Sequence, residues 1–174
     1  MIGFFAKVFV ALNSNSRPGE LASGLAFGFL LALIPGGNLL WAVLFIVAFF
    51  IKHNTGVFLV SLALFRFITP LFDPLLDRLG GAVLEFPALQ SLFTGLYNLP
   101  LLPYTSFNNS LVMGGFLLGL LLWVPLFILF RLLVQIYRVR LAPKISESRL
   151  VRGLKAVPLV SKFLRAVEKV TAYV

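Results

Sequence analysis

Few side chains in this chain could do chemistry, and they lie within a strongly apolar sequence. The candidates are Asn38, Arg66, Thr69, Asp73 and Asp77. Asp73 and Asp77 are spaced to put two carboxylates on one helix face, but Arg66 would neutralise such a pair more readily than tune it. The chain has no cysteine and a single histidine, which excludes thiolate catalysis and a histidine-rich metal site. We therefore expect no enzymatic activity, no metal and no cofactor.

An anion-binding site suits these residue types better. An arginine inside a membrane segment costs ~3 kcal/mol or more unless it is paired, so Arg66 should face protein or water. A helix beginning after Asn38 would offer free N–H groups and the positive end of its dipole to a phosphate. We expect these features to bind a lipid headgroup or another anion; the alternative is an ion pair of Arg66 with an aspartate that only fixes helix packing. The residues assigned to this site are Gly36, Gly37, Asn38, Arg66, Thr69, Asp73 and Asp77.

Composition places these residues in a membrane. Of the 174 residues, 60% are hydrophobic and 12% are charged, against roughly 45–50% and about 25% in soluble domains. Residues 1–130 hold five basic and four acidic residues, net +1, whereas residues 131–174 hold ten basic and two acidic, net +8. The basic end follows an apolar segment, so it indicates the cytoplasmic side and anionic lipid rather than nucleic acid. We expect a multi-pass membrane protein with both termini in the cytoplasm.

Leu21–Ile51 is the stretch that must position the candidate site. It carries no charge, and it is too long for one span of about 20 residues and too short for two. The Pro-Gly-Gly-Asn sequence at 35–38 interrupts it and permits a reversal, and Asn38 suits the N-cap of the second helix. Arg17 and Lys52 flank the stretch, which places both of its ends in the cytoplasm. We predict a re-entrant hairpin whose tip points toward mid-membrane; two thin full crossings are the alternative.

The predicted fold class is all-α, a polytopic integral membrane protein with this hairpin, two full spans and a C-terminal basic amphipathic helix. The expected parts are an N-terminal interfacial helix at 1–16, a membrane domain at 17–140 and a cytoplasmic helix at 144–174. Within the membrane domain we expect the hairpin at 21–51, a span at 57–72, a non-cytoplasmic loop at 73–110 and a span at 111–131. Short helices are expected to begin at Pro74 and to cover Leu89–Leu96.

Small residues spaced by four give two of these segments smooth faces. Such faces let helices approach closely in lipid, within one chain or with a partner. The residues are Gly24, Gly28 and Ala32 in the first segment and Gly115 and Gly119 in the second. Both segments follow an Asn/Ser-rich turn and reach a proline, which fits either two related halves or chance in an apolar sequence.

The helix predicted at 144–174 has apolar residues on one side and basic residues on the other. It is too charged to insert, so it should lie on an anionic membrane surface, dock on a partner helix, or cover the protein's own base. The cations assigned to the membrane surface are Arg149, Arg152, Lys155, Lys162, Arg165 and Lys169.

Several of these motifs carry a family resemblance. They are Gly24 to Gly28, Pro35-Gly36-Gly37-Asn38, Arg66, Thr69-Pro70, Asp73-Pro74 and Asn108-Asn109-Ser110. Over residues 15–140 the chain resembles small bacterial helical membrane proteins of domain-of-unknown-function family 2062. The resemblance is to a short branch that is encoded beside a large membrane-anchored protein, itself similar to the bridge-like lipid-transfer class. It implies a helical fold in the bacterial inner membrane and supplies no catalytic residues.

Together these features predict a small inner-membrane subunit without enzymatic activity. We expect it to bind a larger membrane-anchored partner and to help move or deliver phospholipid between membranes. A stand-alone lipid scramblase or a small anion or solute transporter is the alternative. The expected partners are anionic phospholipid and the larger protein, and not nucleic acid.

Overall fold

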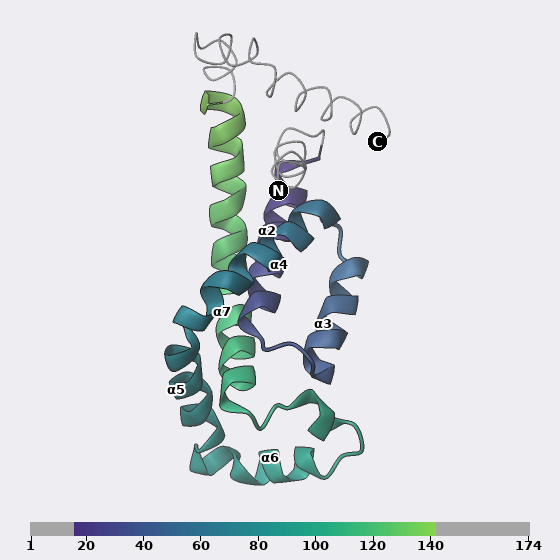
Figure 1. The fold of residues 1–174 in the computed structure, drawn as a ribbon, viewed down its shortest axis with the longest axis vertical. Helices are drawn as coiled ribbons and strands as arrows, with labels where there is room; N and C mark the ends of the chain where they lie inside the picture. Colours follow the sequence, from purple (N-terminus) through teal and green to yellow (C-terminus); the bar gives the residue numbers. More distant parts are fainter. Residues whose placement is uncertain (1–15, 142–174) are drawn as a thin grey trace.

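The computed structural model describes residues 16–141, which form an all-α chain with no strand in that range (Figure 1). The prediction of an all-α fold is therefore confirmed for these residues. The helices expected at 1–16 and 144–174, and with them the six cations assigned to the membrane surface, lie outside the described residues apart from Ser16.

Longer helices alternate with short helical turns along the described part. In chain order they are α2 (Pro18–Leu33), α3 (Leu39–Phe50), α4 (Thr55–Ile68), η1 (Thr69–Leu71), α5 (Asp73–Leu84), η2 (Pro87–Leu89), α6 (Gln90–Tyr97), η3 (Leu102–Thr105), α7 (Ser110–Ile136) and η4 (Tyr137–Leu141). The last of these, η4, is a π-helical turn that continues α7.

The break predicted at 35–38 separates α2 from α3. After α3 the chain returns to the beginning of α2, where the Asn54 N–H donates to Glu20 O at 3.1 Å. Lys52 Nζ also lies 3.5 Å from Glu20 Oε1. The two half-length helices thus form a hairpin whose ends meet, as the sequence predicted.

Gly24 and Gly28 bring α2 against α4 so closely that no side chain fits between them. A Cβ on Gly28 would overlap Ser61 Oγ and lie 2.9 Å from Phe58 O. The Ser61 hydroxyl in turn donates to Gly24 O at 3.1 Å. Residue numbers rise together along the contact, so α2 and α4 run parallel, and this glycine face is used within the chain.

Gly115 and Gly119 bring α7 against α2 in the same way. A Cβ on Gly115 would overlap Leu33 O, and Gly119 packs against α2 one turn further along. Toward the other end of the contact, Leu21 and Val134 share an apolar cluster. α2 therefore runs antiparallel along α7 between Gly115 and Val134.

The contact between α5 and α7 depends on two glycines that the sequence analysis did not assign. A Cβ on Gly80 would overlap Ser110 O, and one on Gly114 would overlap Leu76 O. The pairing of 80 with 110 and 76 with 114 makes these helices antiparallel. Leu76 is fully buried between them, so α5 lies against the first turns of α7 (Figure 1).

α7 is the one helix in the described part that is long and apolar enough to cross a membrane. The apolar segment covers Ser110–Arg140, 31 residues that include η4 as far as Arg140. The helix continues through Pro125 and past Arg131. It thus extends beyond the span expected at 111–131, and it has no counterpart of the break that ends α2.

The segment expected as a span at 57–72 is part of a bent pair instead. Thr55–Leu71 and Asp73–Leu84 are long and apolar enough only when taken together, and they bend by 79° at the break between them. The expected loop at 73–110 is largely helical, because it contains α5, η2, α6 and η3. Two short helices had been predicted there, and both are present, with Pro74 in the first turn of α5.

Aromatic side chains of α3 pack against α4. Trp41 and Phe45 stack with their ring centroids 5.0 Å apart. Phe45 and Phe49 lie 5.7 Å and 6.1 Å from Phe58 of α4. The opposite side of α3 is exposed, and Phe50 at its end is 85% exposed.

Candidate functional site

The α2–α3 break lies near one end of α7 and not beside its middle. Leu33 and Ile34 contact Gly115, which is about 8 Å from the start of α7 at ~1.5 Å per residue. This packing puts the break toward the end of the apolar segment that lies away from the basic residues of η4. The depth of the tip in the membrane stays a prediction.

Arg66 and Thr69 satisfy the carbonyl groups at the end of α2. The last carbonyls of a helix have no partner within it, and here Arg66 Nη1 donates to Ala32 O at 3.0 Å and to Ile34 O at 3.1 Å. Thr69 Oγ1 donates to Ala32 O at 3.0 Å. A cation at this position also interacts favourably with the negative end of the helix dipole. The fully buried Ala32 thus accepts two side-chain hydrogen bonds through its carbonyl.

Asn38 holds the first turn of α3, as predicted for an N-cap. Its Oδ1 accepts from the Trp41 N–H at 2.8 Å, and its Nδ2 donates to Pro35 O at 2.6 Å. The indole Nε1 of Trp41 donates to Leu31 O at 3.1 Å. Trp41 therefore ties α3 to α2, a role the sequence analysis missed. The one signal for it was an indole in the first turn after the cap.

A pocket of about 230 Å³ opens beside this break. Its lining residues are Gly36, Trp41, Leu59, Leu62, Ala63 and Arg66. Within residues 16–141, Nε and Nη2 of Arg66 have no hydrogen-bond partner, because only Nη1 is used. Gly37 lies next to the pocket with φ of 90°. The arrangement offers one guanidinium group and an indole wall in apolar surroundings, which suits an anion attached to an apolar body.

The alternative ion pair of Arg66 with Asp73 or Asp77 is not formed within the described residues. The Asp77 carboxylate accepts a hydrogen bond from Ser110 Oγ of α7. It lines a different pocket, shared with Arg78 and Glu85. The chain bends by 79° before α5, and Asp73 lies in the first turn of that helix. The structure therefore brings together Gly36 and Arg66 around the pocket and Asn38 and Thr69 beside it, but not Asp77.

In the described part, fold and site define a helical protein with one apolar span and a broken helical hairpin. An uncharacterized protein of Treponema pallidum (strain Nichols) is 38% identical to it over 162 residues, which are 93% of this chain and all of the relative. The chain belongs to the same family as this treponemal protein. No family model matches the chain, so the resemblance to family 2062 stays a prediction. No solved structure matches it.

Asn38→Ala should destabilise the hairpin without altering the other helices. It removes both the cap to the Trp41 N–H and the bond to Pro35 O, at an expected cost of about 1–2 kcal/mol. Equilibrium unfolding in mild detergent measures this cost. Hydrogen exchange should show faster exchange at the Trp41 amide, with α7 amides unchanged. A matched control is Asn98→Ala, whose side chain has no hydrogen-bond partner within residues 16–141; equal losses in both variants would contradict the capping role.

Proposed function

We propose that the chain is a small inner-membrane subunit that binds an anionic phospholipid headgroup and helps deliver lipid to a larger membrane-anchored partner. It does so without enzymatic activity. The observation that carries this proposal is the pocket beside the α2–α3 break, where Arg66 has N–H groups that no described residue uses. The alternative is a stand-alone lipid scramblase or a small anion transporter using the same pocket.

The depth of the pocket along α7 supports a headgroup as the ligand. A charged group deep in hydrocarbon is costly, whereas long cationic side chains near helix ends reach the interface. Arg66 lies at the level of Ile34 and Gly115, near the end of α7 that is remote from Arg138 and Arg140. If the basic end of α7 is cytoplasmic, the pocket faces the headgroups of the opposite leaflet.

The same orientation gives the proposed topology. α7 crosses the inner membrane with its basic end inside, and the bent α4–α5 pair makes the other crossing. Glu20 and Lys52, at the joined ends of the hairpin, lie on the cytoplasmic side. Both termini are then cytoplasmic, and α6 lies on the other side, at the opposite end of the molecule from η4 (Figure 1).

An exposed stripe on α7 is the proposed contact with the partner. The glycine faces are occupied by the chain's own helices, so they do not supply this contact. The stripe follows helical spacing along one side of α7, and its residues are Leu117, Leu121, Val124, Ile128 and Leu132, each 36–72% exposed. A transmembrane helix of the partner would cover this stripe, and lipid would cover it otherwise.

Arg66→Lys tests headgroup binding while keeping a cation at the end of α2. The lysine ammonium can donate to Ala32 O and Ile34 O, but it lacks the second set of planar donors that an arginine offers to a phosphate. In nanodiscs we expect the variant to retain its unfolding midpoint and to bind phosphatidylglycerol at least five-fold more weakly by native mass spectrometry. Arg78→Lys, in the pocket beside Asp77, is the control. Unchanged phosphatidylglycerol binding in Arg66→Lys would refute the headgroup site.

The partner contact requires a separate experiment. A photo-crosslinking residue at Leu121 should capture the proposed larger membrane-anchored partner, and one at Phe50, on exposed α3, should not. If Leu121 captures no such protein and the purified chain alone moves fluorescent phospholipid across vesicle bilayers, the scramblase alternative replaces the subunit proposal.

A further inference from the structure

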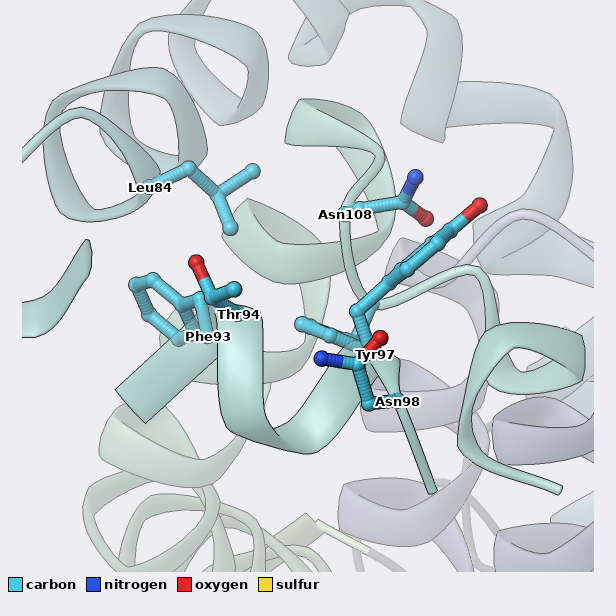
Figure 2. A pocket seen from close by; sticks show the side chains of 7 residues that line it. Leu84, Phe93, Thr94, Tyr97, Asn98 and Asn108 are labelled. Carbon is cyan, nitrogen blue, oxygen red and sulfur yellow. The ribbon is translucent and has the colours of Figure 1, made fainter. Parts of the chain in front are cut away.

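A second pocket, unrelated to Arg66, lies at the end of the molecule formed by α6. It measures about 310 Å³, at the lower end of the ~300–1,000 Å³ of small-molecule sites. Its lining residues are Leu84, Phe93, Thr94, Tyr97, Asn98, Phe107 and Asn108. Figure 2 shows the labelled side chains coming from the end of α5, from α6 and from the turn before α7 around one opening.

The pocket combines aromatic faces with unused polar groups. Phe93 and Tyr97 lie with their rings 6.1 Å and 6.5 Å from that of Phe107. Tyr97 is 52% exposed, Asn98 and Asn108 are also exposed, and within the described residues their hydroxyl and amide groups have no protein hydrogen-bond partner, so a ligand could reach all three. Each amide provides donors and acceptors together, and the phenol does the same. A ligand here would meet flat apolar rings and both kinds of hydrogen-bonding group.

Charge narrows the class of ligand further. Residues 86–130 contain no Lys, Arg, Asp or Glu, and Glu85 lines the pocket that contains Asp77 instead. Without a cation the pocket does not suit a phosphate, and without a carboxylate it does not suit an amine. A quaternary ammonium group would use the aromatic rings but would leave the two amides unused.

We propose that this pocket binds a neutral, hydroxyl-rich ring, which is a sugar residue. The C–H faces of a sugar ring pack on the aromatic rings of Phe93, Tyr97 and Phe107, and its hydroxyls pair with the amides of Asn98 and Asn108. The sugar belongs either to a glycolipid headgroup or to a glycan outside the bilayer. The site is separate from the headgroup site at Arg66, and it does not depend on the proposed function.

The test uses the full chain in nanodiscs with ¹⁵N-labelled asparagine. Methyl-β-galactoside is titrated in one arm, and galactosyl diacylglycerol is added to the bilayer in the other. We expect saturable shifts of the Asn98 and Asn108 side-chain amide signals, with those of Asn38 and Asn109 unchanged. Shifts in both arms support a sugar site open to free glycans, and shifts in the glycolipid arm alone support a headgroup site held by the bilayer.

Matched variants separate the pocket from general surface effects. Tyr97→Ala should weaken sugar binding at least ten-fold, and Tyr104→Ala should not, because Tyr104 is an exposed tyrosine on η3 that does not line the pocket. Arg66→Lys should bind sugar normally even if phosphatidylglycerol binding is lost. Absence of shifts in both arms overturns the proposal, and so does an equal response to tetramethylammonium, which would identify an aromatic cation site.

Discussion

Gly80→Ala is expected to destabilise the fold by about 3 kcal/mol or more. The new methyl group would overlap Ser110 O and lie 2.7 Å from the Gly114 nitrogen. Both are backbone atoms of α7, and they cannot move aside as a flexible side chain can. Overpacking of this kind costs typically ~1–3 kcal/mol, and more where the backbone must shift. Equilibrium unfolding in detergent measures the loss, and hydrogen exchange should show α5 opening before α2 and α4.

Gly81, the next residue in the chain, provides the control for this substitution. Gly81 lies in the same helix, and a Cβ there would meet nothing within 4 Å. Gly81→Ala should therefore stabilise α5 by up to ~1 kcal/mol through helix propensity alone. If both alanine variants behaved alike, the close approach of α5 to α7 would be wrong, and with it the antiparallel arrangement of the two helices.

The features predicted correctly from the sequence are those that depend on residues close together in the chain. The 35–38 break follows from one proline and two glycines in a row, and the cap at Asn38 needs only residues three positions away. The glycine spacing in α2 and α7 predicted close helix packing, since small residues have few other uses in apolar helices. Sequence spacing could not show which helices would pack on these faces, so a partner's helix and the chain's own helices both remained open.

What the sequence did not predict depends on contacts between distant segments. An ion pair of Arg66 with Asp73 or Asp77 was the alternative to an anion site, because these are the acidic residues nearest to it in sequence. The partners of Arg66 are carbonyl oxygens more than thirty positions away, and every residue has a carbonyl, so no residue type marks them. The position of the break along α7 likewise depends on a distant contact, that of Ile34 with Gly115.

Arg66→Met should cost about 3 kcal/mol of unfolding free energy, a loss comparable with that of Gly80→Ala. The substitution leaves Ile34 O without its side-chain donor and Ala32 O with only Thr69. Hydrogen bonds to a charged donor are worth ~1.5–3 kcal/mol, and an unsatisfied buried carbonyl costs ~1–3 kcal/mol. Arg78→Met, on the exposed side of α5, should change stability by less than ~0.5 kcal/mol.

A double-mutant cycle with Thr69→Val identifies the shared carbonyl as the cause. Arg66 and Thr69 both donate to Ala32 O, so either one alone still satisfies it. Thr69→Val alone should cost about 1 kcal/mol. Because the last donor to Ala32 O disappears only in the double variant, its loss should exceed the sum of the single losses by ~1 kcal/mol, within the range for residues that share a partner. Strict additivity would mean that the two side chains act independently, and Arg66 would then stabilise α2 through its charge at the helix end and not through this carbonyl.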